Sequence, residues 1–358
     1  MIMVQGLKIG TILQNGTYRI VKVLGQGSFG ITYLAKAKLR TQGNLGSMNV
    51  EAQVAIKEFF MSEVNSRRSD GSSVEGSSGS VFANYRKKFK KEAENLSKLS
   101  LSNIVKVVDV FDENNTTYYV MEFIEGKNLD DYIKQKGSLP ESEAISIIKE
   151  VGNALEYMHS RKMLHLDIKP KNIMRKPDGT IYLIDFGLSK QFTDNGEPES
   201  STSIGLGTPG YAPIEQSSYK QDGTFPATLD VYALGATMFK MLTGKRPPEA
   251  TIILNEGFPS VELSNKGISD NTISTIKAAM ISTKKERYQT IKAFVENLNK
   301  DDIEDVTIIE QPAQNTESIH STNPSPKPNS KSKWIWSAVL VLVLIVASIL
   351  WKVYPIQK

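Results

Sequence analysis

Short runs in which apolar and polar residues alternate are common in the first third of the chain. Such alternation predicts β-strands, because successive side chains of a strand point to opposite faces of a sheet. The runs that predict strands cover residues 18–25, 31–38, 54–60, 104–111 and 117–123. Apolar residues in 82–99 recur every three or four positions and predict one amphipathic helix. The segment 62–80, rich in Ser, Gly and charge, predicts a flexible loop.

The pattern becomes helical after Gly126. Residues 141–159 carry apolar side chains on one side of a predicted helix, at Ala144, Ile147, Ile148, Val151, Leu155 and Met158. Further helices are expected at about 230–243 and 271–299. Strands followed by helices predict an α+β fold with two lobes and a cleft between them.

The last sixty residues differ from the rest. Residues 301–333 are polar and rich in Asn, Ser, Thr and Pro, which predicts a disordered linker. An uncharged run of about 18 residues follows, and as a helix it would be roughly 27 Å long, close to the thickness of a bilayer core. Trp334, Trp336, Trp351 and Tyr354 lie at its ends, where aromatic rings prefer the interface. We therefore expect one transmembrane helix at 334–354 and a short external tail at 355–358, the alternative being a buried core helix.

Composition excludes several classes of function. The chain has 358 residues, which suits a two-lobed enzyme domain with an appendage. A net charge of +4 does not indicate a nucleic-acid partner. The absence of cysteine excludes disulfides, thiolate zinc sites and thiol catalysis. Residues 1–17 lack a long apolar core, so an N-terminal leader that is not a secretory signal is expected.

A glycine-rich turn joins the first two predicted strands. Gly25, Gly27 and Gly30 form a Gly-x-Gly-x-x-Gly motif, which alone fits a dinucleotide-binding turn or an ordinary hairpin. Here a strand follows the motif, whereas a dinucleotide-binding turn requires a helix, so NAD binding is disfavoured. Glycines in such a turn allow the backbone to approach phosphate groups closely.

Lys57 ends the run Val-Ala-Ile-Lys on the third predicted strand. Its ammonium group suits the α- and β-phosphate oxygens of a nucleotide, although an isolated lysine is more often a solvated surface charge. Its place after the glycine motif favours the phosphate role. We expect Glu92 to be its partner, because Glu92 shares the inward side of the helix with Leu96 while Glu94 faces another side.

Two aspartates and one asparagine are the candidate catalytic and metal-binding residues. Asp167 is followed five positions later by Asn172, and Asp185 opens the sequence Asp-Phe-Gly. Phosphoryl transfer needs a carboxylate near the attacking hydroxyl, oxygen ligands for magnesium and a cation near the phosphate, a place for Lys169. His165 could act as a base, but we expect a buried structural histidine, since aspartates already supply the catalytic groups.

These motifs, in this order over about residues 18–300, resemble the eukaryotic-type (Hanks-type) Ser/Thr protein kinases. The glycine-loop and Val-Ala-Ile-Lys-Glu-Phe-Phe sequences resemble those of a bacterial member. The resemblance implies a bilobal protein-kinase fold, with a β-rich N-lobe and a helical C-lobe. It implies ATP and Mg²⁺ as cofactors, with Mn²⁺ as an alternative ion, and transfer of the γ-phosphoryl group to Ser or Thr of protein substrates.

The resemblance assigns a role to each matching residue. The catalytic residues would be Lys57 and Glu92 as an ion pair, Asp167 as the base and Lys169 as the phosphate partner. The metal ligands would be Asn172 and Asp185. The nucleotide-binding residues would be Leu24, Gly25, Gly27, Gly30, Thr32, Ala55, Lys57, Met121 as gatekeeper, Glu122 and Ile124 in the hinge, and Met174 beneath adenine. Glu215 would pair with Arg287, and Asp230 would open a helix that braces the catalytic loop.

The chain departs from the family pattern at a few places. Leu166 replaces the arginine that usually precedes the catalytic aspartate and that reads a phosphate on the activation loop. We therefore expect activity that does not depend on loop phosphorylation, although residues 200–203 offer hydroxyl groups. Thr32 stands where valine is usual and is close to it in size, so we expect little effect; Pro213-Ile214-Glu215 replaces Ala-Pro-Glu and keeps the charged residue.

Two other functions compete with an active protein kinase. One is a kinase-fold scaffold, or pseudokinase, that binds nucleotide at the membrane without turnover. The presence of Lys57, Asp167, Asn172 and Asp185 favours catalysis. The other is a small-molecule kinase, which the Gly-Thr-Pro run at 207–209 and the long activation segment disfavour.

The membrane segment suggests a topology. Because ATP is cytosolic, residues 1–333 should lie inside, giving a single-pass protein of the cytoplasmic (inner) membrane that contacts the lipid bilayer through 334–354. Lysines at 327, 331 and 333 support this orientation weakly. The short external tail makes a ligand-sensing receptor improbable, and dimerisation stays open, since the span has no pair of small residues four apart.

Overall fold

The structure is a computed structural model that describes residues 6–27, 30–43, 46–61, 65–69, 71–76, 79–187, 189–193, 197–198, 207–220 and 222–300. The predicted linker, membrane span and external tail lie outside these residues, as does the start of the leader. Within the described ranges, no helix combines the length and the apolar character needed to cross a bilayer.

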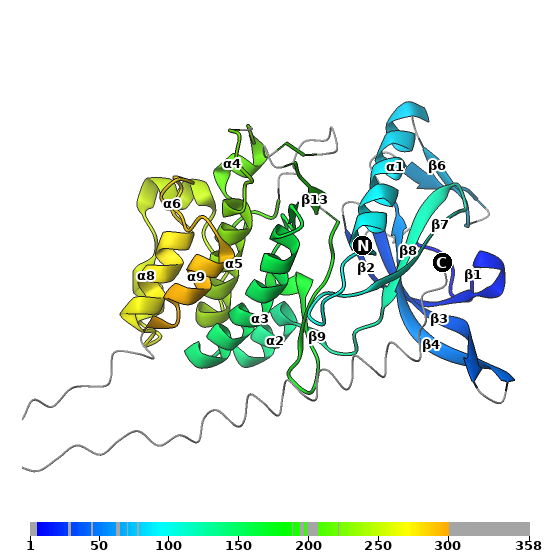
Figure 1. Cartoon of the computed structure of the whole chain (residues 1–358), viewed down its shortest axis with the longest axis horizontal. Helices are drawn as coiled ribbons and strands as arrows, with labels where there is room; N and C mark the ends of the chain where they lie inside the picture. The colour runs from blue at the N-terminus through cyan, green and yellow to red at the C-terminus, as the bar shows by residue number, and fades with distance from the viewer. Residues whose placement is uncertain are drawn as a thin grey trace, which may run out of the picture. The chain divides into compact units, whose positions relative to one another are not determined.

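The N-terminal lobe is built on a six-stranded antiparallel sheet with the order β1-β2-β3-β4-β8-β7 (Figure 1). Its strands are β1 Ile12–Leu13, β2 Tyr18–Gly27, β3 Gly30–Gly43, β4 Gly46–Phe59, β7 Val107–Glu113 and β8 Thr116–Glu122, with a 3₁₀ turn at Gln14–Gly16 after β1. Five of these strands match the five alternating runs of the sequence, so that part of the prediction is confirmed.

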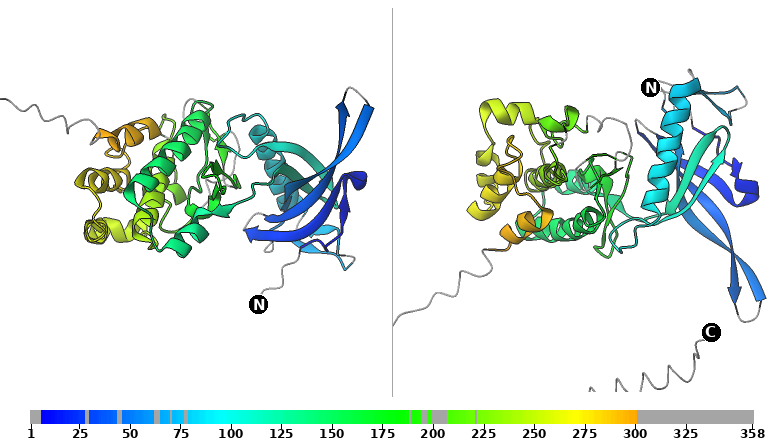
Figure 2. Two further views of the ribbon diagram at one scale, coloured as in Figure 1. Left: turned by 90° about the horizontal axis from the view of Figure 1, so that it is seen from below. Right: turned by 45° about the horizontal axis from the view of Figure 1, so that its top comes forward.

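Strands β3 and β4 extend further than the alternation indicated. They pair without a break from Gly30 opposite Phe59 to Gly43 opposite Gly46. Strand β2 pairs with β3 only as far as Ala37, and β8 pairs with β4 only over residues 54–58. The outer half of the hairpin is therefore a two-stranded ribbon that projects from the sheet (Figure 2).

Helix α1, Gly79–Leu96, covers one face of the sheet and is the helix predicted at 82–99. Aromatic rings hold it there: Phe82 and Phe89 lie 5.6 and 5.5 Å from the ring of Phe59, and Phe89 lies 5.2 Å from that of Tyr119. The helix thus packs against the strands that carry Lys57 and its neighbours.

The prediction of a loop at 62–80 is wrong in part. The described part of this segment contains a hairpin of β5, Asn65–Arg67, and β6, Val74–Gly76, and helix α1 already begins at Gly79. The local sequence has too little apolar alternation to predict these strands. Hydrogen bonds from Arg67 to Glu58 and to the carbonyl of Ser72 stabilise them instead, and apolar alternation does not encode such polar contacts.

The C-terminal lobe is helical (Figure 1). Its helices are α2 Leu129–Lys136, α3 Glu141–His159, α4 Ile214–Ser217, α5 Thr228–Thr243, α6 Ala250–Glu256, α7 Ser260–Ser264, α8 Asp270–Ala279 and α9 Ile291–Asn297. Every residue of α5 except Lys240 is buried, so this helix forms the centre of the lobe. The bounds of α3 are those predicted, and α5 begins two residues before its predicted start.

A single helix at 271–299 was also predicted, and the structure corrects this. Helix α8 ends at Ala279, and α9 begins only after Thr290, whose hydroxyl accepts a hydrogen bond from the Ala293 N–H. Between them, the buried guanidinium group of Arg287 donates to the backbone carbonyls of Ile281 and Ser282. Those carbonyls are turned toward the side chain, which a continuous helix would not allow.

Short strands flank the catalytic motifs. They are β9 Lys127–Asn128, β10 Met163–Leu164, β11 Ile173–Arg175, β12 Ile181–Leu183 and β13 Lys190–Gln191, with a 3₁₀ turn at Pro170–Asn172. Strands β12, β11 and β9 form one small sheet, and β10 pairs with β13. A hydrophobic core runs through both lobes, and the described part of the chain confirms the bilobal fold.

Candidate active site

A buried aspartate binds the start of the loop between β10 and β11. Asp230 lies in the first turn of α5 and accepts hydrogen bonds from the backbone N–H groups of His165 and Leu166, at 3.0 and 2.9 Å. The imidazole of His159 lies 2.8 Å from the same carboxylate. The predicted bracing role of Asp230 is confirmed, and the loop is fixed at its start.

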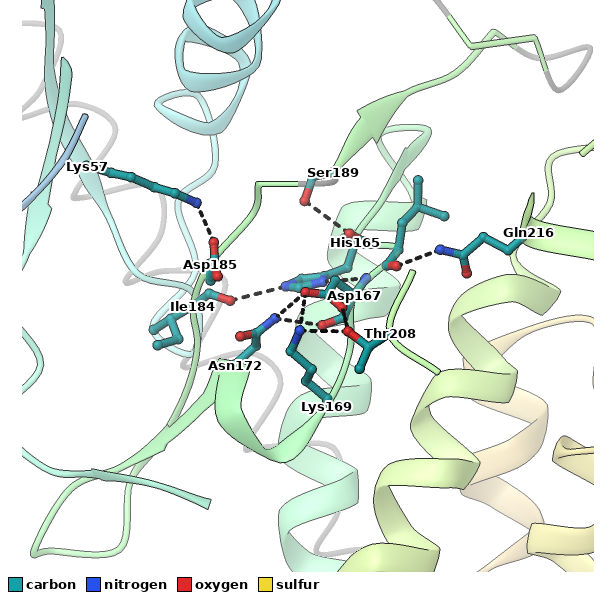
Figure 3. A network of polar contacts seen from close by, with 11 residues as sticks. Lys57, His165, Asp167, Lys169, Asn172, Ile184, Asp185, Ser189, Thr208 and Gln216 are labelled. Carbon is teal, nitrogen blue, oxygen red and sulfur yellow. Dashed lines mark hydrogen bonds and ion pairs between the residues drawn. The ribbon is translucent and has the colours of Figure 1, made fainter. Parts of the chain in front are cut away.

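Asp167 is at the centre of a cluster of polar side chains (Figure 3). One carboxylate oxygen accepts a hydrogen bond from the Thr208 hydroxyl at 2.6 Å. The other accepts from Lys169 Nζ at 2.7 Å and from Asn172 Nδ2 at 2.9 Å. These bonds fix the orientation of the carboxylate, and its 11% exposed side chain is still open to a substrate.

Asn172 and Asp185 are brought together by backbone pairing. The N–H of Ile184 donates to the carbonyl of Asn172 at 2.9 Å, which places Asp185 beside the catalytic loop (Figure 3). The Asn172 amide nitrogen is engaged by Asp167, and its amide oxygen accepts no hydrogen bond from the described residues. Asp185, with a φ of 58°, keeps a side chain that is 45% exposed.

This pair of oxygen donors fits magnesium. Mg²⁺ usually binds one or two protein oxygen groups and completes its octahedron with water and substrate phosphates. A carboxylate and an amide oxygen at adjacent positions meet that requirement. No cluster of three acidic or histidine side chains occurs within the described ranges, so a closed protein cage for a metal is not found there.

Lys57 on β4 is buried and forms an ion pair with the partly exposed Asp185, and its Nζ lies 5.9 Å from the centre of the Tyr119 ring. Burial alone would lower the pKa of Lys57, but the charge of Asp185 raises it above its usual value. Burial likewise favours a higher pKa for Asp185, and the charge of Lys57 outweighs this and holds it below its usual value. Both groups are therefore charged at neutral pH.

Glu92 lies on the inner side of α1, as the sequence indicated, but it does not form the expected ion pair. Among the described residues, the ion-pair partner of Lys57 is Asp185. Burial raises the pKa of Glu92 to about 7, against the opposing charges of Lys190, Lys57 and Lys88. Of these three lysines, Lys190 on β13 has the largest effect on the pKa of Glu92. Glu92 therefore interacts with the segment after Asp185 as well as with Lys57.

Glu92→Gln should make the stability of the protein less dependent on pH. A raised pKa in the folded state gives stability that is present at low pH and is lost as the pH rises toward 7. From pH 5.5 to 8.5 the wild type should lose about 2 kcal/mol relative to the variant. Urea unfolding of both proteins at the two pH values measures this, with Glu94→Gln on the exposed side of α1 as control. If the unfolding free energies of wild type and Glu92→Gln differ by the same amount at both pH values, the expectation is contradicted.

The predicted nucleotide-binding residues lie on the strands that meet near Lys57. Gly25 pairs with Thr32, Thr32 with Lys57, and Ala55 with Met121. Of the others, Leu24 is exposed, Gly27 ends β2, Glu122 ends β8, Ile124 is buried just beyond it and Met174 is half-buried on β11. Residues 28–29 at the tip of the glycine turn lie outside the described part.

Gly30 occupies a position where a side chain does not fit. A Cβ atom there would overlap the backbone carbonyl oxygen of Glu58 on the neighbouring strand. The third glycine of the motif is thus explained by the close approach of two strands, which keeps the turn near Lys57.

Two further predictions are confirmed. Glu215 and Arg287 form an ion pair of 2.6 Å, and the guanidinium group, 2% exposed as a residue, also donates to the carbonyl of Thr228. His165 is completely buried, and burial lowers its pKa. A structural histidine is therefore favoured over a general base.

The sequence did not indicate two features of the site. One is the direct bond from Thr208 to Asp167: the Gly-Thr-Pro run was interpreted only as a mark of substrate class. The other is an apolar cluster beneath the catalytic loop, made of Leu164, Leu166, Phe192 and Leu229. The leucine at 166 was the signal for this cluster, since an apolar residue in a polar loop needs a buried partner.

Comparison with known proteins agrees with this geometry. A family model described as a protein kinase domain matches residues 18–311. A probable serine/threonine-protein kinase of Clostridium perfringens is 32% identical over 301 residues, which are 82% of this chain and 39% of that protein. Serine/threonine-protein kinase PknA of Nostoc sp. is 31% identical over 292 residues, 80% of this chain and 47% of that protein.

A third relative is serine/threonine-protein kinase PrkC of Bacillus subtilis, 28% identical over 283 residues, which are 77% of this chain and 39% of that protein. The chain thus matches less than half the length of each of these three relatives. The family match covers both lobes and every motif of the polar cluster around Asp167. The chain belongs to the protein kinase domain family.

Proposed function

We propose that the chain is an ATP-dependent Ser/Thr protein kinase. The observation that supports this most directly is the cluster in which Lys169, Asn172 and Thr208 all bond to Asp167. The ion pair of the buried Lys57 with Asp185 lies beside that cluster. A scaffold without turnover would have no use for a carboxylate oriented by three donors.

The residues of the cluster would divide the reaction between them. Asp167 would accept a hydrogen bond from the substrate hydroxyl and take its proton as the new oxygen–phosphorus bond forms. The bond between the γ-phosphorus and the β–γ bridging oxygen breaks, and ADP leaves. Lys169 and Lys57 would neutralise phosphate charge. Mg²⁺, held by Asn172 and Asp185, would supply further neutralisation of the phosphate oxygens when bound.

Two local features support Ser or Thr of a protein as the acceptor. Lys169 is followed by Pro170, which begins the 3₁₀ turn and keeps the lysine next to Asp167. The Thr208 hydroxyl bridges Asp167 and Lys169, so the segment after the activation loop is connected to the catalytic carboxylate. A substrate segment docked along 207–211 would present its hydroxyl to Asp167.

Transfer of labelled phosphate tests this proposal. The purified chain should phosphorylate itself or a general protein substrate with Mg-ATP, and hydrolysis of the product should give phosphoserine and phosphothreonine. Mn²⁺ in place of Mg²⁺ should also support transfer, because both accept oxygen ligands. Binding of ATP without any transfer would instead favour the scaffold.

We also propose that residues 334–354 anchor the kinase in the cytoplasmic membrane with residues 1–333 on the ATP side. The uncharged run and its flanking tryptophans support this. The full chain should resist extraction from membranes by alkaline carbonate, and a chain that ends at Lys333 should be released. Release of both forms by carbonate would reject the anchor.

The apolar cluster under the catalytic loop supports activity without loop phosphorylation. Leu166 is 3% exposed and packs with Phe192 and Leu229, and its carbonyl accepts a hydrogen bond from Gln216 Nε2 at 2.9 Å. These contacts connect the catalytic loop with residues on both sides of the activation loop. An arginine at position 166 would need a phosphate group on the activation loop to make such a connection.

Replacement of Ser200, Ser201, Thr202 and Ser203 by Ala together, all outside the described residues, should leave the rate within about twofold, since changes without a structural role alter free energies by about 0.5 kcal/mol or less. Leu166→Ala, in contrast, should destabilise the protein by about 2–5 kcal/mol, because it leaves a cavity in the cluster. Initial rates and urea unfolding measure the two effects. A collapse of the rate in the quadruple variant would mean that a loop phosphate is required.

A further inference from the structure

A buried acidic residue follows Lys57 directly on β4. Glu58 is completely buried, and both oxygens of its carboxylate are engaged. Arg67 Nη1 and Nη2 donate to them at 3.1 and 2.6 Å, and the hydroxyl groups of Tyr33 and Tyr118 donate at 2.6 and 2.9 Å. Four hydrogen bonds and one opposite charge compensate for the burial of this carboxylate.

Glu58 and Lys57 point to opposite faces of the sheet, as neighbours on a strand must. Lys57 lies on the face that α1 covers, with Tyr119, whereas Glu58 lies on the other face with Tyr33 and Tyr118. The Tyr33 hydroxyl also accepts a hydrogen bond from the Leu7 N–H at 3.0 Å. The backbone that carries Lys57 is therefore held from the face opposite to its ammonium group.

Arg67 brings a second element to this position. It belongs to β5 of the hairpin inserted between β4 and α1, and its Nη1 also donates to the carbonyl of Ser72 at 2.8 Å. Its guanidinium group lies 5.2 Å from the centre of the Phe60 ring. Burial would lower the pKa of Arg67, but its hydrogen bonds to Glu58 and the charge of Glu58 raise it. The hairpin is thus fixed at β4 by a two-point ion pair.

The far strand of the hairpin contacts helix α1 and the β7–β8 turn. The Val74 N–H donates to the carbonyl of Asn114, and Asn115 Nδ2 donates to the carbonyl of Val74. Gly76 is so close to Phe82 that an added Cβ atom would lie 2.6 Å from the ring. Through Phe82 and its contact with Phe59, the hairpin supports the start of the helix that carries Glu92.

We propose that Arg67 and Glu58 are positioning residues for phosphoryl transfer: their ion pair attaches the 65–76 hairpin as a brace between the Lys57 strand and helix α1. The brace sets the position of Lys57 relative to Asp185 and the nucleotide phosphates. This proposal rests on the proposed function. It assigns a role to the segment between β4 and α1.

Arg67→Met tests the brace, with Arg68→Met as a matched control. Arg68 is the next residue of the hairpin, and its ion pair with Glu75 is exposed. Displacement of a phosphate-binding group by a remote change lowers rates by roughly 10- to 100-fold, so kcat/KM for ATP should fall by that factor in Arg67→Met. The KM for the protein substrate should stay unchanged, and Arg68→Met should behave as the wild type. Arg67→Lys should recover part of the loss.

A second variant separates position from stability. Arg67→Met leaves the buried charge of Glu58 without a counter-charge and lowers stability, whereas the pair Arg67→Met with Glu58→Gln carries no charge at that site. The double variant should therefore unfold at a higher urea concentration than Arg67→Met. Its kcat/KM for ATP should still be lowered, because the two-point contact is lost.

Nucleotide affinity provides a readout that does not require turnover. Calorimetric titration with Mg-ADP should give weaker binding for both Arg67→Met and the double variant, and amide hydrogen exchange in 79–96 should become faster. A wild type that binds Mg-ADP without transferring phosphate would defeat the proposed function but would leave these comparisons intact. Wild-type nucleotide affinity and unchanged exchange in a folded double variant would overturn the brace.

Discussion

Asp185→Ala is expected to reduce phosphoryl transfer by about 10³-fold, near the upper end for removal of one electrostatic group from an active site. The carboxylate is a candidate magnesium ligand beside Asn172 and is also the ion-pair partner of Lys57. Its removal deprives the metal of one of two protein ligands and leaves a buried ammonium group unpaired. Initial rates of transfer to a protein substrate at saturating Mg-ATP measure the loss.

A double-mutant cycle with Lys57→Met determines whether the two residues act as a unit. Because each single change destroys the same arrangement, the double variant should be scarcely slower than either single variant. Losses that multiply would mean that Lys57 and Asp185 act independently. All variants should show the far-ultraviolet circular dichroism of the wild type, which confirms that they are folded.

Asp230→Ala is expected to lower the free energy of unfolding by about 3–5 kcal/mol, the range for removal of one partner from a buried charged network. Asp230 is completely buried, and its carboxylate accepts hydrogen bonds from the N–H groups of His165 and Leu166. Without it, two buried donors lack acceptors, and each such donor costs about 1–3 kcal/mol. Urea unfolding at pH 7 measures the change.

The effect of Asp230 should depend on pH in a defined direction. Burial alone would raise the pKa of Asp230, but the hydrogen bond and charge of His159 contribute to lowering it below its usual value. A depressed pKa gives stability that is present above the unfolded pKa of about 3.9 and is lost as the pH falls through the folded pKa. The difference in unfolding free energy between the wild type and Asp230→Ala should therefore become smaller on acidification below about pH 4.

Asp222→Ala is the matched control for Asp230→Ala. Asp222 forms an ion pair with Lys284, and both side chains are more than one third exposed. A pair of this kind contributes less than about 1 kcal/mol, because solvent screens it. A similar loss of stability in the two variants would mean that burial of Asp230 is not the cause of its effect.

The sequence was informative where the signal is local. Alternation predicted the strand at 18–25, where Tyr18 and Ile20 are buried and Arg19 and Lys22 are exposed, and the spacing in 141–159 gave helix α3 its observed bounds. The catalytic loop was recognisable because its chemistry requires Asp167 and Asn172 at a fixed separation. These features depend on residues close together in the chain.

Features that depend on distant contacts were not predicted. The 65–76 hairpin is stabilised by the contact of Arg67 with Glu58, whose carboxylate also binds the hydroxyl of the distant Tyr118. The break between α8 and α9 is stabilised by the contacts of Arg287 with Glu215 and Thr228. The partner of Lys57 was not predicted either. Glu92 and Asp185 can each supply a carboxylate, and only the position of α1 relative to β4 selects between them.

The projecting β3–β4 ribbon makes the chain suitable for a genetically encoded reporter. Strand β4 runs ten residues from Ser47, near the tip of the ribbon, to Lys57. At about 3.3 Å per residue, this places the tip roughly 33 Å along the strand from the ammonium-bearing residue. A fluorescent protein inserted between Gly43 and Gly46 should therefore report on the location of the enzyme in living cells while its turnover stays intact.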